Sequence, residues 1–242
     1  MIDNITEIEY IIKHFKNNDI SIENDQAEKL YLFYKILIEK NTVINLTAIT
    51  EFKDVVDKHF VDSAILTKYV DLNEKNIIDI GTGAGFPGIP LKIIHPDLNV
   101  TLLDSLNKRI VFLNEVIEAL NLENITTIHS RAEELAQKNE YREKYDIAVS
   151  RAVSNLSTLV EYCLPFVKVH GSFYSYKSSK ALGEINEASN AIKTLGGIVV
   201  NNFNLQIFGT DYERSIIEIK KNSTTPKKYP RGGNKPLSNP IK

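Results

Sequence analysis

A glycine-rich segment between two apolar stretches is the part of the sequence that most clearly offers chemistry. Gly81, Gly83 and Gly85 follow the apolar residues 76–80, and an amphipathic stretch begins near Gly88. Glycines at such a strand-to-helix turn tolerate positive φ angles and let a ligand approach the backbone. The spacing of Gly83, Gly85 and Gly88 also satisfies the pattern of dinucleotide-binding proteins. The turn alone therefore predicts a nucleoside-containing ligand without choosing among them.

Two aspartates narrow the choice of ligand. Asp79 precedes the first glycine by two residues, where its carboxylate can meet the amino group of a methionine moiety and would repel a pyrophosphate. Asp104 ends the next apolar run and can accept hydrogen bonds from both ribose hydroxyls, a role that NAD enzymes share. Either aspartate alone is better explained as a surface or capping carboxylate. Their combination favours S-adenosylmethionine as the ligand.

The pattern along the chain predicts an α/β protein with a helical N-terminal region. Apolar residues at helical spacing indicate helices over 5–17, 22–40 and about 52–70, with a polar break at Asn41. Short apolar runs then alternate with amphipathic ones, which indicates a largely parallel sheet. The expected strands are 76–80, 99–103, 125–129, 145–149 and 171–176, and the expected helices are 88–95, 107–120, 131–138, 155–166 and 181–195.

The sheet is expected to end in an antiparallel hairpin of strands 197–208 and 212–220. Such a hairpin is typical of the Rossmann-like class I S-adenosylmethionine-dependent methyltransferases and is missing from a plain dinucleotide-binding fold. We therefore expect a helical region over 1–75, a methyltransferase domain over 76–221 and a basic tail over 222–242.

Composition and charge restrict the class of protein. Apolar residues make up 43% and charged residues 25% of the chain, as in ordinary globular proteins. The net charge of −2 is unevenly distributed, because seven of the 29 basic residues and none of the acidic ones lie between Lys220 and Lys242. On charge alone, this tail is equally a loose solvated segment or an RNA-binding arm. No signal peptide or membrane-spanning run is recognisable, so we expect a cytoplasmic protein.

Several other chemistries lack the residues they need. The five histidines, at 14, 59, 95, 129 and 170, have no metal-ligand spacing, so we expect no metal. There is no P-loop and no G-x-S-x-G motif. The fourth strand is not followed by the Asn/Asp-Pro-Pro motif of amine methylases, and the single Cys163 lies in an apolar run that favours a buried side chain over a nucleophile. The acceptor is therefore expected to be nucleophilic without a covalent or basic helper.

Motifs spread over nearly the whole chain resemble the small-subunit ribosomal RNA methyltransferase G family, also called glucose-inhibited division protein B. They lie at residues 45–49, 58–63, 79–90, 103–109, 131–134, 150–153 and 229–231. The resemblance implies methylation of guanine N7 in the 530 loop of bacterial 16S rRNA, with S-adenosylmethionine as donor. It also implies cofactor contacts at Gly81, Phe86, Ala132, Glu133 and Arg151.

Basic residues are the candidates for holding RNA. Lys108 and Arg109 begin a helix, where positive charge suits the helix dipole poorly and a phosphate well. Arg151 and Lys177 end strands at the ligand edge, and we expect them to position the guanine and nearby phosphates. Three tail residues complete the predicted RNA contacts: Lys227, Lys228 and Arg231.

Some questions stay open at this level. A NAD(P)-dependent oxidoreductase and a non-catalytic RNA-binding protein of the same fold are alternatives. Phe86 can pack on the cofactor or only on a helix. A place in the core explains His59, and a place in a turn explains Asn45, as well as a functional role does. Ser178 and Ser179 stand where the family usually has a glycine. We expect a monomer. The sequence leaves open whether its substrate is bare RNA, an assembly intermediate or a complete small subunit.

Overall fold

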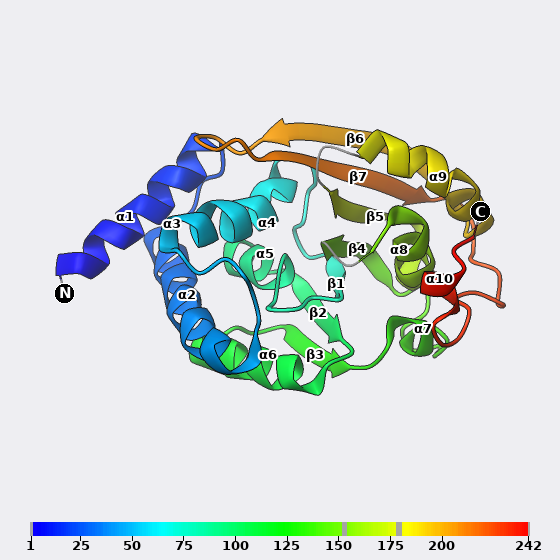
Figure 1. Ribbon diagram of the computed structural model, residues 1–242, viewed down its shortest axis with the longest axis horizontal. Coiled ribbons are helices and arrows are strands. Elements are labelled where there is room, and N and C mark those ends of the chain that lie inside the picture. Colours follow the sequence, from blue (N-terminus) through cyan, green and yellow to red (C-terminus); the bar gives the residue numbers. More distant parts are fainter. Residues whose placement is uncertain (1, 152–153, 178–180, 242) are drawn as a thin grey trace.

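The chain forms a seven-stranded sheet in the order β3-β2-β1-β4-β5-β7-β6, seen edge to edge in Figure 1. The computed structural model describes residues 2–151, 154–177 and 181–241. The strands are β1 (Asn76–Ile80), β2 (Asn99–Asp104), β3 (Ile125–His129), β4 (Tyr145–Arg151), β5 (Val167–Lys177), β6 (Gly197–Gln206) and β7 (Glu213–Lys221). Strands β1 to β5 are parallel, whereas β7 runs antiparallel to β5 and to β6. The predicted fold class is therefore confirmed.

Helices cover both faces of the sheet. Helices α5 (Gly88–Ile94) and α6 (Asn107–Ala119) lie on one face, α2 (Asn24–Ile44) packs against both of them, and α1 (Ile2–Asn17) packs against α2 and the turn Val56–Val61. Helices α7 (Ala132–Leu135), α8 (Leu156–Cys163) and α9 (Ala181–Thr194) lie on the other, together with the 3-10 turn η3 (Leu164–Phe166). A short helix, α10 (Lys235–Ser238), packs against α8 near the C-terminus. Alternating residues of β1 explain the two layers, because Ile77 faces the first core and Ile78 the second.

The helical N-terminal region differs from its prediction in two places. Helix α2 continues past Asn41, whose side chain accepts hydrogen bonds from the backbone of Leu46 and Thr47 and so supports the end of the helix. The expected helix over 52–70 is broken into α3 (Phe52–Val55), the π-helical turn η1 (Val56–Val61), α4 (Asp62–Ala64) and the 3-10 turn η2 (Ile65–Lys68). This region shares one apolar core with the sheet, because Phe33 of α2 and Phe60 of η1 pack against Phe86.

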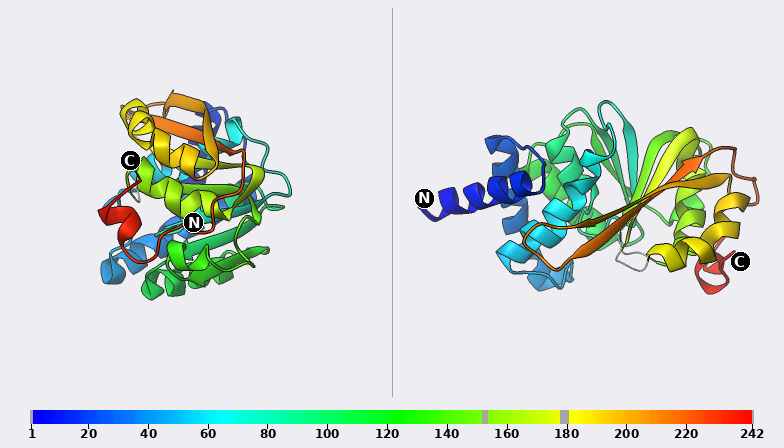
Figure 2. Two further views of the ribbon diagram at one scale, coloured as in Figure 1. Left: turned by 90° about the vertical axis from the view of Figure 1, so that its right-hand side faces the viewer. Right: turned by 90° about the horizontal axis from the view of Figure 1, so that it is seen from above.

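The hairpin of β6 and β7 reaches back to the helical N-terminal region, as the right-hand view of Figure 2 shows. Phe203 stacks on Tyr69 with ring centroids 4.2 Å apart, and the backbone of Phe208 donates to the side chain of Asn18. These contacts bring β7 beside the broken helix. Among the described residues, no helix is long and apolar enough to cross a membrane.

The tail is not a loose segment. Arg142 donates hydrogen bonds to the carbonyls of Thr225, Pro226 and Tyr229, and Lys221 is fully buried against Leu164 and Thr225. Arg231 binds both carboxylate oxygens of Glu161, which is fully buried in α8. The sequence left a loose segment and an RNA-binding arm equally open, because composition does not reveal the distant partners of the tail.

Substituting Arg231 tests how firmly the tail is anchored. Arg231→Ala leaves the Glu161 carboxylate buried without its partner, so we expect the free energy of unfolding to fall by about 3 kcal/mol. The double variant Arg231→Gln/Glu161→Gln should lose less, because neither group is then an unpaired charge. Denaturant unfolding measures both, with Lys228→Ala in the exposed part of the tail as control. An Arg231→Ala protein as stable as this control would show that the ion pair does not anchor the tail.

Candidate functional site

A cavity of about 480 Å³ opens at the carboxyl ends of β1 to β4. Most of the residues predicted to hold a cofactor line this cavity: Gly81, Gly83, Phe86, Asp104, Ala132, Glu133 and Arg151. They come from four separate loops that follow parallel strands, which is where open α/β sheets bind ligands. Asp79 and Gly85 lie behind the wall of the cavity.

Asp79 shapes the glycine turn from below. Its Oδ2 accepts hydrogen bonds from Thr82 Oγ1 at 2.7 Å and from the backbone nitrogen of Gly88 at 2.9 Å. The side chain is fully buried, and its Oδ1 has no partner among the described residues. Asp79 does not line the cavity, because its side chain folds back under the turn, and its contact with a methionine amino group stays a prediction. Burial raises the pKa of this carboxyl to about 6, although both hydrogen bonds oppose the shift.

The glycines serve different purposes within the turn. Gly81 and Gly83 have φ angles of 70° and 62°, so the chain turns at the cavity floor with the left-handed backbone that glycine allows. Gly85 does not touch the cavity. Gly85 also has a positive φ angle, 93°, and a Cβ atom there would lie 2.4 Å from Cδ1 of Ile89, so both its backbone and its packing against α5 favour glycine. The spacing in the sequence did not separate these two roles.

Two buried carboxylates stand on the cavity wall. Asp104 Oδ2 accepts from the backbone nitrogen of Gly83 at 3.0 Å and from Arg109 at 3.1 Å, and its Oδ1 accepts from Leu106. Glu133 begins α7 and is only 4% exposed, with Arg131 Nη1 3.4 Å away. Carboxylate oxygens fixed at a cavity wall suit the hydroxyl and amino groups of an adenosine. The residues present therefore fit the adenosine part of S-adenosylmethionine.

A wall of stacked side chains closes the inner end of this cavity. The ring of His59 stacks on Phe86 with centroids 4.5 Å apart, and the guanidinium of Arg151 lies 4.9 Å from the Phe86 centroid. Arg151 Nη2 is 3.2 Å from His59 Nδ1, and Thr47 Oγ1 is 2.8 Å from His59 Nε2. Burial, and then the charge of Arg151, lower the pKa of His59 to about 3. The imidazole is therefore neutral at physiological pH.

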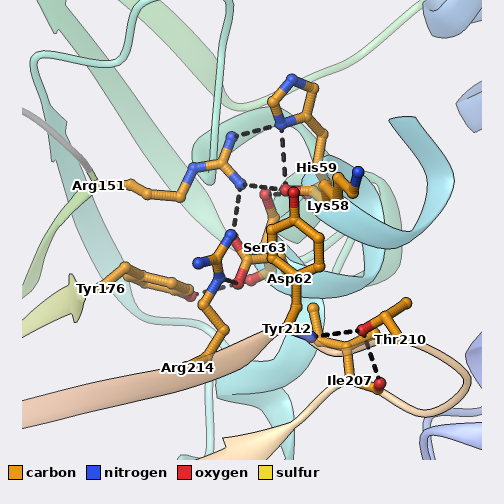
Figure 3. A network of polar contacts seen from close by, with 10 residues as sticks. All are labelled: Lys58, His59, Asp62, Ser63, Arg151, Tyr176, Ile207, Thr210, Tyr212 and Arg214. Carbon is orange, nitrogen blue, oxygen red and sulfur yellow. Dashed lines mark hydrogen bonds and ion pairs between the residues drawn. The ribbon is translucent and has the colours of Figure 1, made fainter. Parts of the chain in front are cut away.

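A second cavity, of about 390 Å³, lies beyond this wall. His59 and Arg151 line both cavities. The other residues around the second cavity are Ile49, Lys58, Asp62, Tyr176, Lys177 and Arg214. Figure 3 shows the polar network of this region, in which Arg151 and Arg214 both point toward Asp62. The two adjoining cavities offer space for two reactants, which would meet beside His59 and Arg151.

The basic residues predicted to hold RNA differ in their exposure and in whether an acidic side chain already pairs with them. Lys108, Lys227 and Lys228 are exposed. Lys177 lines the second cavity, but its ammonium donates to Glu184 and to the carbonyl of Ser154, both at 2.7 Å. The remaining two are held in ion pairs, Arg109 with Asp104 and Arg231 with Glu161.

Sequence reasoning missed Asp62 and Arg214. Asp62 lies inside a motif of the resemblance, but nothing marked it as a partner of residues far along the chain. Arg214 follows Glu213 at the start of an apolar strand, and an arginine in such a strand was the only available signal. Ala152, Val153, Ser178 and Ser179, which belong to motifs or departures noted in the sequence, lie outside the described residues.

Other expectations about this site can be compared with the structure. Cys163 is fully buried, as predicted, and burial raises the pKa of its thiol well above the ordinary value. His59 lies at the cavity wall and Asn45 ends α2 with a left-handed backbone. In the part of the chain that the structure describes, no cluster of side chains could hold a metal ion.

Comparison with known proteins gives concordant results. The family model described as rRNA small subunit methyltransferase G matches residues 26–211. A protein of Lachnoclostridium phytofermentans named ribosomal RNA small subunit methyltransferase G is 50% identical over 231 residues, which cover 95% of this chain and 96% of that one. A Bacillus subtilis protein of the same name is 47% identical over 235 residues, 97% of this chain and 98% of that one.

Solved structures of more distant proteins share the fold. A SAM-dependent methyltransferase from Aquifex aeolicus superposes with a TM-score of 0.53 at 15% identity, covering 69% of this chain and 92% of that one. The TYW2 protein of M. jannaschii in complex with AdoMet gives 0.51 at 15% identity, with 66% and 74% covered.

The buried Asp79 predicts a pH-dependent stability. Its pKa in the folded chain, about 6, lies above that of an exposed aspartate, so stability is lost as pH rises through this interval and the carboxyl ionises. Asp79→Asn removes that loss. From pH 4.5 to pH 8, we expect the free energy of unfolding of the variant to rise by about 2 kcal/mol relative to that of the wild type, measured by urea unfolding. The exposed Asp25→Asn is the control, and an equal pH dependence in wild type and Asp79→Asn would contradict the prediction.

Proposed function

This chain belongs to the rRNA small subunit methyltransferase G family, and from that premise we propose that it methylates N7 of a guanine in the 530 loop of bacterial 16S rRNA, with S-adenosylmethionine as donor. The observation that carries the proposal is the pair of adjoining cavities that share His59 and Arg151. One cavity holds two carboxylates that can accept hydrogen bonds from an adenosine, and the other is lined mostly by basic groups. Family membership leaves no support for the NAD(P)-dependent oxidoreductase considered above.

The first cavity would hold S-adenosylmethionine along its length. Asp104 would accept hydrogen bonds from the ribose hydroxyls, and Ala132 and Glu133 would meet the adenine. The turn at Gly81 and Gly83 lets the methionine part approach the backbone closely. Phe86 lines this cavity and would contact the donor, while it also packs against Phe33 and Phe60 in the core.

The proposed transfer needs no proton acceptor on the enzyme. When bound, the donor would supply an electrophilic methyl group to the lone pair of N7, and its sulfur would be the leaving group. Guanine N7 is an acceptor on the base edge and carries no proton at neutral pH. The neutral His59 need not act as a base. Arg151, held by Asp62, Lys58 and His59, would orient the base by position alone.

RNA outside the cavities would meet exposed basic residues. Lys108 begins α6 beside the first cavity, and Lys227 and Lys228 extend from the anchored tail. We propose these three as phosphate contacts, and Lys177 as a positioning residue at the second cavity. Arg109 and Arg231 are less suited, because carboxylates already bind them. Such a protein would act in the cytoplasm, where ribosomes are made, and we propose that it does so as a monomer.

Asp104 is the sharpest test of the cofactor site. Asp104→Ala removes the proposed acceptor of the ribose hydroxyls, and we expect S-adenosylmethionine binding to weaken by about 1.5–3 kcal/mol in calorimetry. Asp104→Asn keeps one acceptor oxygen for the turn and should lose less. Because Asp104 also binds the backbone of Gly83 and Leu106, unfolding curves of both variants serve as the control. Unchanged affinity in a folded variant would remove Asp104 from the site.

The acceptor atom and the missing base can be tested together. With saturating RNA, single-turnover rates should vary little between pH 6.5 and 8.5, because His59 has a pKa of about 3 and Asp79 one of about 6. RNA labelled from S-adenosylmethionine should become cleavable at one guanine by borohydride and aniline, and sequencing the cut places it in or outside the 530 loop. A unit-slope limb in that range would reveal an essential base. Labelled but uncleavable RNA would mean another acceptor atom.

A further inference from the structure

Asp62 is a buried carboxylate shared by two arginines. Its Oδ2 accepts from Arg151 Nη1 and its Oδ1 from Arg214 Nε, each at 2.8 Å, and its side chain is 2% exposed. One negative charge thus faces two positive ones, in a region that also holds Lys58 and Lys177. Those two lysines have acidic partners, Asp54 and Glu184, so the excess positive charge belongs to the arginine pair. The second cavity is therefore electropositive.

Arg214 has hydrogen-bond donors to spare. Only its Nε is bound by Asp62, and its Nη1 and Nη2 have no hydrogen-bond partner among the described residues. The guanidinium packs on the ring of Tyr212, 5.0 Å from the centroid, and the side chain is 22% exposed. Asp62 on one edge and Tyr212 on one face fix the plane of the guanidinium (Figure 3). Two donors are therefore held ready at the second cavity.

We propose that the second cavity contains a phosphate subsite, in which Arg214 binds a phosphate of the RNA strand next to the target guanosine. This inference rests on the proposed function, because the RNA is what brings the phosphate. Two parallel guanidinium donors match two oxygens of a phosphate, and phosphate contacts fix the register of a nucleic acid. Arg151 lines both cavities, so a phosphate bound at Arg214 lies beside the point where the proposed transfer takes place.

Arg214 is better suited to a phosphate than to the target base. A guanidinium fork binds guanine through O6 and N7, but N7 must keep its lone pair free to accept the methyl group in the proposed reaction. A side chain that recognises the N–H groups of guanine has to accept hydrogen bonds, as a carboxylate does. The only carboxylate that lines the second cavity within the described chain is Asp62, and both of its oxygens already bind arginines. Asp62 is therefore a positioning residue that sets the orientation of Arg214, and Arg214 is the binding residue.

The salt dependence of RNA binding tests the subsite directly. Arg214→Gln removes one phosphate contact, so the slope of log affinity against log salt should become shallower by about one, with the KM for RNA raised about tenfold or more. Affinity for S-adenosylmethionine should stay within about twofold, since Arg214 does not line the first cavity. Lys193→Gln removes the same charge from an exposed site on α9 and is the matched control. Arg214→Lys keeps the charge without the fork, and should restore the slope but only part of the KM.

Two further outcomes separate this inference from the proposed function. Guanosine 5′-monophosphate should bind the wild type more tightly than guanosine does, and Arg214→Gln should abolish that preference, whether or not RNA is methylated. If the wild type transfers no methyl group to small-subunit rRNA, the proposed function fails while this titration still tests the subsite. A slope and KM for Arg214→Gln equal to those of Lys193→Gln would overturn the subsite. A loss confined to kcat, with an unchanged slope, would also overturn it, by placing Arg214 on the base.

Discussion

The arrangement of both cavities depends on one buried carboxylate. Asp62 belongs to the broken helix of the N-terminal region, Arg151 ends β4 and Arg214 begins β7. A carboxylate shielded from water is costly unless its charge is paired and its oxygens are hydrogen-bonded, and here each oxygen binds a guanidinium. The same two contacts join three segments that lie 89 and 152 residues apart in the sequence. The wall between the cavities therefore forms only when the helical region, the parallel sheet and the terminal hairpin are all in place.

The irregular helix before Asp62 has a related purpose. The π-helical turn Val56–Val61 has a wider backbone than an α-helix, and π-helical turns recur at functional sites. In this chain the carbonyl of Lys58 accepts from Arg151 Nη1 at 3.2 Å, the ring of His59 faces Phe86, and Phe60 enters the core. Three consecutive residues thus serve the second cavity, the wall and the core. The helical region is part of the site, because it supplies side chains that the sheet lacks.

What the sequence could predict follows from how far apart the interacting residues are. The strand-to-helix turn at Gly81 and the carboxylate of Asp104 are local features of single βα units, so spacing alone located them. The roles of Asp79 and Gly85 needed the packing beneath the turn, which is set by α5 and Leu113. The sequence left the tail open between a loose segment and an RNA-binding arm, because its anchors, Arg142 and Glu161, lie far earlier in the chain. Arg214 escaped notice for the same reason, since its meaning comes only from Asp62.

The net charge of −2 does not describe the charge around the two cavities. In the first cavity, Asp104 and Glu133 are paired with Arg109 and Arg131. At the second cavity, Arg151 and Arg214 outweigh Asp62, which favours a polyanion. In the proposed reaction the methylated guanine would carry a positive charge. The basic groups at the second cavity would then face a base that has become cationic. The attraction between these groups and the RNA would weaken, so the electrostatics that help to bind the RNA would also favour release of the methylated product.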